Sequence, residues 1–432
     1  MDRYAGLCKW SPSRYCSDLL LLRRIVIDFL ARSFKGAYRF LLEFLARRPP
    51  MSISTVIIKP TKFCNATCTY CSAPPEVNGA PKWSQDEFRG YFDKLHPYLS
   101  SNAVLLWHGG EPMLMGADFY WKAWEYVQET KPGIRFSMQS NILAYDRKRW
   151  KDVLQGPFNY SISSSFDPDE QNREFKGSTS LYTRIFNSRL DAMLEDGFHP
   201  KVIGTYTEET IPLALDMYDR AKATGEACFD IRINYRYPAG RDEGNGAMLL
   251  PKTYGKVLLE LYDRWISDLP HFVVTPLDEM FKKTIGLDTS RCPWSRHCGG
   301  HFLGLEPNGD VYNCSEFADL GDETYRFGNL REQTLPEVLA SKISVATRRR
   351  RVDLPMDCKS CRHFNECEGG CMRDSVLYGR GLGGKFYYCH SWMMVFDRIK
   401  QSIMTGEADG AIRKYGLNPD DVRRTLGYAA AA

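Results

Sequence analysis

Three cysteines early in the chain stand at a spacing that suits a metal cluster. Cys64, Cys68 and Cys71 form a CxxxCxxC motif. Three thiolates cannot close a structural zinc site, which usually takes four protein ligands. They do suit a [4Fe–4S] cluster in which one iron has no protein ligand and stays open to a further molecule. The motif therefore predicts an iron–sulfur cluster with one open coordination position.

A larger group of cysteines lies in the C-terminal half. Of the 14 cysteines in the chain, eight fall here, namely Cys292, Cys298, Cys314, Cys358, Cys361, Cys367, Cys371 and Cys389. Eight ligands make two sets of four, which would saturate two [4Fe–4S] clusters, and zinc would satisfy the same count. No secretory signal is evident, so we expect a cytoplasmic protein in which these cysteines bind metal rather than form disulfides.

The elements that must position these cysteines alternate between apolar strands and amphipathic helices. Strands are expected at 53–58, 103–107, 134–138, 160–163, 201–206 and 229–233. The first helix begins at Ser84, a good N-cap followed by acidic residues. This order predicts an α/β fold with a parallel sheet, and six units favour a partial (β/α)6 barrel over a closed eight-fold one. The CxxxCxxC motif begins six residues after the first strand, at the carboxyl end of the sheet.

The pattern changes near residue 288, where strands become short and Gly and Cys become frequent. We expect an amphipathic helical extension over residues 1–50, a partial barrel over 51–287, a small Cys-rich domain over 288–392 and C-terminal helices over 393–432. The net charge of +4 gives no support for nucleic-acid binding. The basic helix at 18–48 could contact a membrane surface weakly or pack on its own protein, since its apolar run Leu19–Leu22 is too short to span a bilayer.

Several motifs resemble those of the radical SAM superfamily, in the same order. The first cysteine motif is similar to CxxxCxΦC with Tyr70 as the aromatic, and residues 108–112 resemble the GGEP motif after the second strand. The resemblance implies that S-adenosylmethionine (SAM) binds the open iron. Glu111 would accept the methionine ammonium, and Gly109 and Gly110 would let the backbone approach the ligand. Further SAM contacts implied by the resemblance follow the third and fourth strands: Gln139, Ser140 and Ser165.

The C-terminal cysteines are similar to the SPASM extension of radical SAM enzymes, as is the segment 300–312 around them. The resemblance implies an inner auxiliary cluster on Cys292, Cys298, Cys314 and Cys371, and an outer one on Cys358, Cys361, Cys367 and Cys389. Three [4Fe–4S] clusters are then expected. A flavodoxin- or ferredoxin-type donor would reduce the first cluster, and the auxiliary clusters would take or relay an electron from the substrate, so the net outcome is oxidative.

Enzymes of this layout act mostly on peptides or proteins, so the resemblance implies a ribosomally made precursor peptide as the substrate. Sulfatase maturases of this kind carry an Asp directly after the cysteine that here is Cys314, as the base in formylglycine formation. This chain has Ser315 and then Glu316 instead, and a serine cannot replace a carboxylate base at neutral pH. We therefore expect a side-chain crosslink, with formylglycine as the alternative. Candidate proton acceptors are Asp167, Asp169 and Glu316.

Two further interpretations remain open. An iron–sulfur electron carrier or a zinc-structured binding module would share the cysteines, although neither needs six β/α units and a GGEP motif. The run Arg348–Arg351 would either contact an acidic leader or donor protein or lie in a solvated linker.

Overall fold

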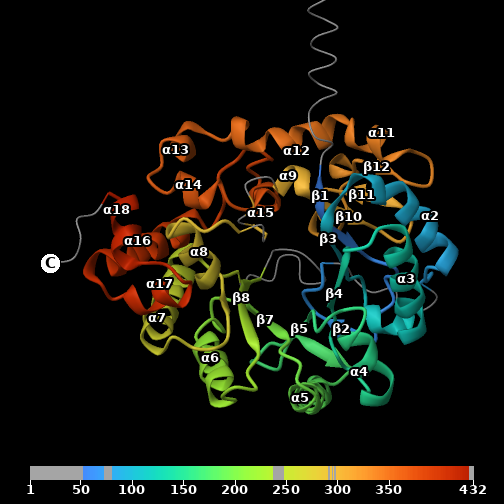
Figure 1. The fold of residues 1–432 in the computed structure, drawn as a ribbon, viewed down its shortest axis with the longest axis horizontal. Coiled ribbons are helices and arrows are strands. Elements are labelled where there is room, and N and C mark those ends of the chain that lie inside the picture. The colour runs from blue at the N-terminus through green and yellow to red at the C-terminus, as the bar shows by residue number, and fades with distance from the viewer. Residues whose placement is uncertain are drawn as a thin grey trace, which may run out of the picture. The chain divides into compact units, whose positions relative to one another are not determined.

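The computed structural model describes residues 52–72, 80–236, 248–289, 292–293, 295 and 298–427. Ser52–Ala432 form one compact unit. The expected helical extension over residues 1–50 lies outside the described residues, so its proposed membrane contact stays a prediction. Figure 1 shows the arrangement of the elements, and their labels are used below.

Within the described residues, one ten-stranded sheet carries the fold, in the order β12-β11-β10-β1-β3-β4-β5-β7-β8-β9. All neighbouring strands from β10 to β9 pair in parallel. The six strands expected from the sequence are β1 (Ile53–Ile58), β3 (Leu99–Trp107), β4 (Arg135–Gln139), β5 (Ile162–Ser165), β7 (Lys201–Tyr206) and β8 (Asp230–Tyr235). The partial parallel barrel is therefore confirmed, with one edge left open at β9.

Helices follow these strands and lie outside the curved sheet (Figure 1). They are α2 (Gln85–Leu95), α3 (Ala117–Thr130), α4 (Arg147–Gln155), α5 (Thr179–Glu195), α6 (Leu213–Ala223) and α7 (Pro251–Asp268). The expected N-cap is confirmed, because Ser84 accepts from the N–H of Glu87 and the Glu87 carboxylate accepts from the N–H of Ser84 in return. Helix α2 buries Phe88, Phe92 and Leu95 against the sheet side of the molecule.

The Cys-rich segment continues the barrel sheet rather than standing apart from it. Strand β10 (Phe302–Leu305) pairs in parallel with β1, and β11 (Asp310–Tyr312) and β12 (Gly328–Asn329) follow it antiparallel. On the other edge β8 pairs with the short β9 (Val274–Thr275). Hydrogen bonding thus crosses the boundary expected near residue 288, and β1 lies between strands of both parts.

A buried group of three charges joins the two parts at the end of β1. Lys59 is 1% exposed and lies 2.9 Å from the carboxylate of Glu306, with Asp319 as a second ion-pair partner. Burial alone lowers the pKa of Lys59, but the charges of Asp319 and Glu306 outweigh it and raise the pKa above its usual value. Ser72, next to the first cysteine motif, also donates to Asp319 at 3.2 Å. The first cysteine loop is therefore fixed to the Cys-rich part.

The remaining helices surround the C-terminal cysteines and close the chain. They are α8 (Leu277–Thr284), α9 (Cys298–His301), α10 (Ser315–Ala318), α11 (Leu335–Leu339), α12 (Lys342–Asp353), α13 (Met356–Lys359), α14 (Phe364–Cys367), α15 (Met372–Leu377), α16 (Cys389–Thr405), α17 (Asp409–Lys414) and α18 (Pro419–Thr425). The expected C-terminal helices are present, and the first begins at the last cysteine. None of the helices in the described ranges is long and apolar enough to cross a membrane.

Candidate functional site

The first cysteine motif lies in the loop after β1, beside a small second sheet. Strand β2 (Ala66–Cys68) pairs antiparallel with β6 (Arg173–Phe175), which sets Cys68 opposite Arg173. The N–H of Cys71 donates to the carbonyl of Cys68 at 3.3 Å and so turns the loop back on itself. The short pairing of β2 with β6 therefore fixes the backbone of the loop that carries the three cysteines.

The three thiols of the loop lie close enough to act on one another. Burial raises the pKa of Cys64 to about 12, and the charges of Glu111, Cys68 and Cys71 add to the rise. A thiol in such surroundings stays protonated until a metal takes the place of the proton. The grouping of Cys64, Cys68 and Cys71 therefore fits the open-cornered iron–sulfur cluster that the spacing predicts.

The two glycines of the GGEP motif allow the loop after β3 to touch the cysteine loop. Gly109 has φ +124°, and a Cβ on it would lie 2.5 Å from the carbonyl oxygen of Thr61. A Cβ on Gly110 would lie 2.2 Å from the carbonyl oxygen of Phe63. The sequence predicts that these glycines let the backbone approach a ligand closely. In the structure they let the GGEP loop approach the backbone that carries the cysteines.

Glu111 is 1% exposed, and three donors surround its carboxylate. One oxygen accepts from the N–H of Met113 and the hydroxyl of Ser140, both at 2.8 Å, and the other accepts from the N–H of Asn141 at 2.7 Å. Burial raises the pKa of Glu111 to about 7, although these hydrogen bonds lower it. Ser140, expected to contact SAM, orients Glu111 through this hydrogen bond.

Asn141 connects the carboxylate to the cysteine loop, a role that the sequence did not reveal. Its side-chain amide donates to Asn65 at 2.8 Å and lies 3.8 Å from the sulfur of Cys64. Gln139 and Ser165, the other expected SAM contacts, are hydrogen-bonded to each other at 3.0 Å at the ends of β4 and β5. The expected SAM-binding residues therefore gather at the carboxyl end of the sheet, around the cysteine loop.

Tyr70 and Arg173, both half-buried, form one network with the buried Asp167. Asp167 is 3% exposed, forms an ion pair with Arg173 at 2.9 Å and accepts from the hydroxyl of Tyr70 at 2.5 Å. The same guanidinium reaches the sulfur of Cys68 at 3.8 Å and lies over the ring of Tyr70. Arg173 was missed by the sequence reasoning, because no motif marks it. Asp167 thus holds a cation beside the first cysteine motif.

Asp169 lies close by, in the loop between β5 and β6, and is less enclosed. It accepts from the amide of Asn172 at 2.8 Å. Burial raises its pKa, and the charge of Asp167 adds to the rise.

The inner set of cysteines comes together from four separate segments. Burial raises the pKa of Cys314, and the charges of Cys298 and Cys292 add to the rise. The pKa of Cys371 is likewise raised by burial and by the charges of Asp374, Cys292 and Cys314. Gly304 of β10 permits this packing, since a Cβ on it would lie 2.6 Å from the backbone of Cys314. The four cysteines that the resemblance assigns to the inner cluster therefore lie near one another in the structure.

Glu316 lies next to the inner set but is not a free carboxylate. It accepts at 2.6 Å from Arg373, whose side chain is 2% exposed, while its own side chain is 45% exposed. Arg373 also binds Asp374 at 3.1 Å, and Asp374 accepts from the hydroxyl of Tyr235. The buried guanidinium therefore fixes the carboxylate that stands nearest in sequence to Cys314.

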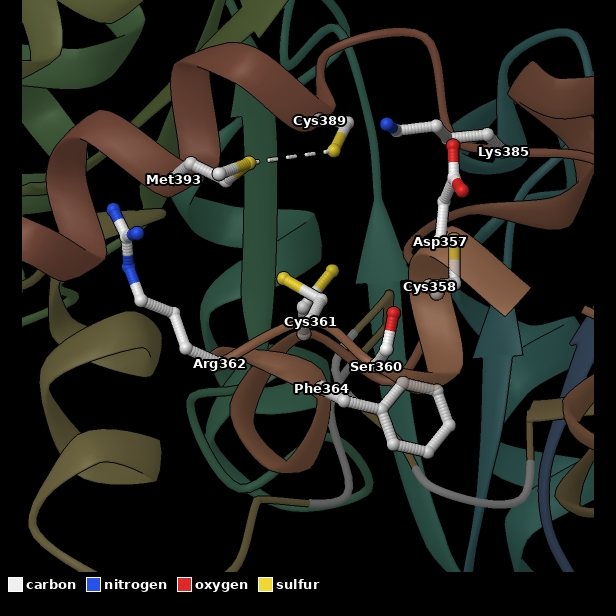
Figure 2. A pocket seen from close by; sticks show the side chains of 11 residues that line it. Asp357, Cys358, Ser360, Cys361, Arg362, Phe364, Lys385, Cys389 and Met393 are labelled. Carbon is white, nitrogen blue, oxygen red and sulfur yellow. Dashed lines mark hydrogen bonds between the residues drawn. The ribbon is translucent and has the colours of Figure 1, made fainter. Parts of the chain in front are cut away.

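The outer set surrounds a cavity of about 490 Å³ (Figure 2). Cys358, Cys361, Cys367 and Cys389 all line it, and Figure 2 shows the thiols of Cys361 and Cys389 facing one another across the space. Burial raises the pKa of Cys367 to about 12, and the charges of Cys389, Cys358 and Cys361 add to the rise. Among the described side chains, no group of three or more His, Cys, Asp or Glu is arranged to hold a metal ion. Four thiols around an open cavity fit a multi-iron cluster.

Known proteins resemble the chain over most of its length. A model of the SPASM family, an iron–sulfur cluster-binding domain, matches residues 292–362. The serine-type anaerobic sulfatase-maturating enzyme of Bacteroides thetaiotaomicron is 25% identical over 400 residues, which cover 83% of this chain and 94% of that enzyme. A cysteine-type enzyme of Clostridium perfringens is 24% identical over 369 residues, 81% of this chain and 96% of its own.

Solved structures share the fold. The structure of polyhistidine-tagged anSMEcpe with bound AdoMet superposes with a TM-score of 0.69 at 21% identity, covering 86% of this chain and 98% of that one. Streptococcus suis SuiB bound to its precursor peptide SuiA gives a TM-score of 0.56 at 13% identity, over 83% and 80% of the two chains. The chain therefore has a C-terminal SPASM domain, is similar over most of its length to anaerobic sulfatase-maturating enzymes, and shares the fold of an AdoMet-binding enzyme.

Proposed function

We propose that this enzyme cleaves SAM reductively at Cys64, Cys68 and Cys71 and oxidatively modifies a ribosomally made peptide, forming a side-chain crosslink. The observation that carries the proposal is the separation of the cysteines into one group of three and two groups of four. Peptide substrates are supported by relatives: anSMEcpe is known with a bound Cp18Cys peptide and SuiB with its precursor peptide. Three [4Fe–4S] clusters and a flavodoxin- or ferredoxin-type donor complete the proposal.

The residues around Glu111 would hold the methionine end of SAM. A carboxylate that already has three donors keeps lone pairs for the substrate amino group, and its burial strengthens that contact. Asn141 couples this carboxylate to the cysteine loop, so that the amino group and the open iron are held at a fixed separation. Tyr70, Gln139 and Ser165 are proposed to line the rest of the SAM site.

A reduced cluster held by Cys64, Cys68 and Cys71 would supply the electron for reductive cleavage of SAM. Cleavage would remove one hydrogen atom from the peptide and release methionine and 5′-deoxyadenosine. A crosslink requires that the peptide also lose one electron, to the auxiliary site, and one proton, to a base or to water. In total the peptide loses two hydrogen atoms.

The surroundings of Cys314 favour the crosslink over formylglycine. The next residue, Ser315, is buried and neutral, and Glu316 is bound to Arg373. The Arg373 guanidinium therefore already occupies an oxygen of this carboxylate and orients it. Formylglycine formation with Glu316 as the base remains the second candidate, because its side chain is 45% exposed and lies beside the inner set.

The test of SAM cleavage uses anaerobically reconstituted full-length protein with SAM and dithionite. We expect release of methionine and 5′-deoxyadenosine, and loss of both products in Cys68→Ala. Cys228→Ala is the matched control, since Cys228 is buried outside all three groups. Equal turnover in Cys68→Ala and Cys228→Ala would contradict the proposal.

The product is identified by mass spectrometry on peptides. Candidate substrates are a precursor peptide encoded near the enzyme, and Ser- and Cys-containing sulfatase peptides. A loss of two hydrogen atoms that does not react with aldehyde reagents supports a crosslink. An aldehyde-reactive product from a sulfatase peptide, lost in Glu316→Gln, would establish the second candidate instead.

A further inference from the structure

The arginine run 348–351 lies in helix α12 rather than in a linker, so the interpretation as a solvated linker is wrong. The four side chains differ sharply in their surroundings. Arg349 is 64% exposed and binds Asp353 of its own helix at 3.5 Å, as a surface residue does. Arg350 is only 7% exposed and points into the Cys-rich part. A buried arginine needs partners, because an unpaired charge is costly away from water.

The backbone partners of Arg350 lie between the two cysteine sets. Its guanidinium donates to the carbonyl of Gly369 at 2.8 Å and to the carbonyl of Leu382. Gly369 stands between Cys367 of the outer set and Cys371 of the inner set. The segment that joins the two sets is therefore bonded directly to this guanidinium.

Helix α12 also packs against the start of α9, where Cys298 of the inner set lies. A Cβ on Gly299 would lie 2.3 Å from the carbonyl oxygen of Thr347, three residues before Arg350. Such close contact leaves the helix little freedom to shift. Arg350 is thus hydrogen-bonded to two backbone segments, and its helix packs against a third.

The charges near Arg350 and one unpaired N–H of its side chain indicate what the guanidinium faces. Burial lowers the pKa of Arg350, while the charges of Cys371, Cys298, Cys358 and Cys367 raise it. Two of these cysteines belong to the inner set and two to the outer one. The Nε–H of Arg350 is buried and has no partner among the described residues. A buried donor without a partner is costly, so it points to an acceptor that belongs to the site.

We propose that Arg350 is a positioning residue for electron transfer, which places one positive charge between the two auxiliary clusters and donates its Nε–H to a cluster sulfur. The inference rests on the proposed function, since it requires clusters on both cysteine sets. A positive charge next to a cluster stabilises the reduced form, which carries more negative charge. Arg350 therefore raises the reduction potentials of both auxiliary clusters and eases acceptance of the electron from the peptide.

The experiment compares Arg350→Gln with Arg349→Gln, a neighbour on the same helix whose side chain faces solvent. Iron and sulfide content are measured first, and the potentials of the three clusters are then followed by EPR during a redox titration. In Arg350→Gln we expect both auxiliary potentials to move in the negative direction, with the potential of the SAM-binding cluster unchanged. Arg350→Lys, which keeps the charge, should restore most of the shift, and Arg349→Gln should match the wild type.

Each outcome bears on the inference. Wild-type protein that lacks iron at the C-terminal cysteines overturns the proposed function itself. Full iron content with unshifted auxiliary potentials in Arg350→Gln overturns only the role of Arg350. If the Gln variant fails to hold clusters, pulsed EPR of wild-type protein labelled with ¹⁵N-arginine decides. Nitrogen coupling to a reduced auxiliary cluster, lost in Arg350→Lys, supports the hydrogen bond, and its absence in the wild type refutes it.

Discussion

Replacing Glu111 by Gln separates the charge of this buried side chain from its shape. The carboxylate accepts three hydrogen bonds, from Met113, Ser140 and Asn141. An amide of the same size keeps one acceptor oxygen but turns the other position into an NH₂ donor. That NH₂ would face either the Ser140 hydroxyl or the Asn141 N–H. The variant therefore loses the negative charge proposed to hold the amino group of SAM.

The expected loss of affinity follows from the burial of the site. A hydrogen bond to a charged group contributes about 1.5–3 kcal/mol. With 1.4 kcal/mol per factor of ten, the dissociation constant of SAM should rise roughly 10- to 150-fold in Glu111→Gln. Equilibrium dialysis or calorimetry on anaerobic, cluster-loaded protein measures this directly. Glu125→Gln is the control, because Glu125 lies exposed on helix α3.

The pH dependence provides a second and sharper criterion. Burial raises the pKa of Glu111 to about 7, so the carboxylate gains its proton as the pH falls through that value. Only the ionised form attracts the SAM amino group, and each pH unit below 7 reduces its population about tenfold. Wild-type affinity should therefore fall between pH 8 and pH 6, while that of Glu111→Gln stays nearly level. Equal affinities at pH 8 with equal iron content would refute the assignment.

Three further variants test other parts of the structure. Lys59→Met leaves Glu306 and Asp319 buried without their cation and should lower the free energy of unfolding by about 3–5 kcal/mol in urea denaturation. Lys62→Met, 43% exposed, should change it by less than about 1 kcal/mol. Asp167→Asn frees Arg173 and should slow the release of 5′-deoxyadenosine about tenfold without peptide, as the loss of one charged contact predicts. If Asp167 is instead the proton acceptor, that release is unchanged and only peptide oxidation fails. Cys361→Ala should reduce the iron bound at the outer site while SAM cleavage without peptide persists, as elemental analysis and product assays will show.

The sequence predicts most of the fold because its signals are local. Strand periodicity places all six barrel strands within a few residues, and Ser84 caps the first helix as its side chain and the acidic first turn suggest. Cysteine spacing and the family resemblance predict the three thiol groups. The pairing of strand β10 with β1 was not predicted, because the sequence of a four-residue apolar strand does not indicate which strand it will pair with.

The charged residues that organise the site are less accessible to sequence reasoning. Lys59 pairs with Asp319 across 260 positions, and Arg173 reaches Cys68 across 105. Asn141 follows Gln139 and Ser140 in the segment expected near SAM, but its contact with the cysteine loop appears only in the structure. Lys59 and Arg173 carry no periodicity and no motif. Their roles appear only when the topology brings distant segments together.

Buried cations accompany each thiol group, and this arrangement bears on the reaction. Arg173 lies beside the first group, Arg373 beside the inner one, and Arg350 between the inner and outer ones. Clusters bound by thiolates are anionic, so burying them is tolerable only with compensating positive charge. Two of these arginines also bind the candidate bases, Asp167 and Glu316. In the proposed crosslinking reaction the proton of the peptide would then go to water or to a base that is not held in such an ion pair.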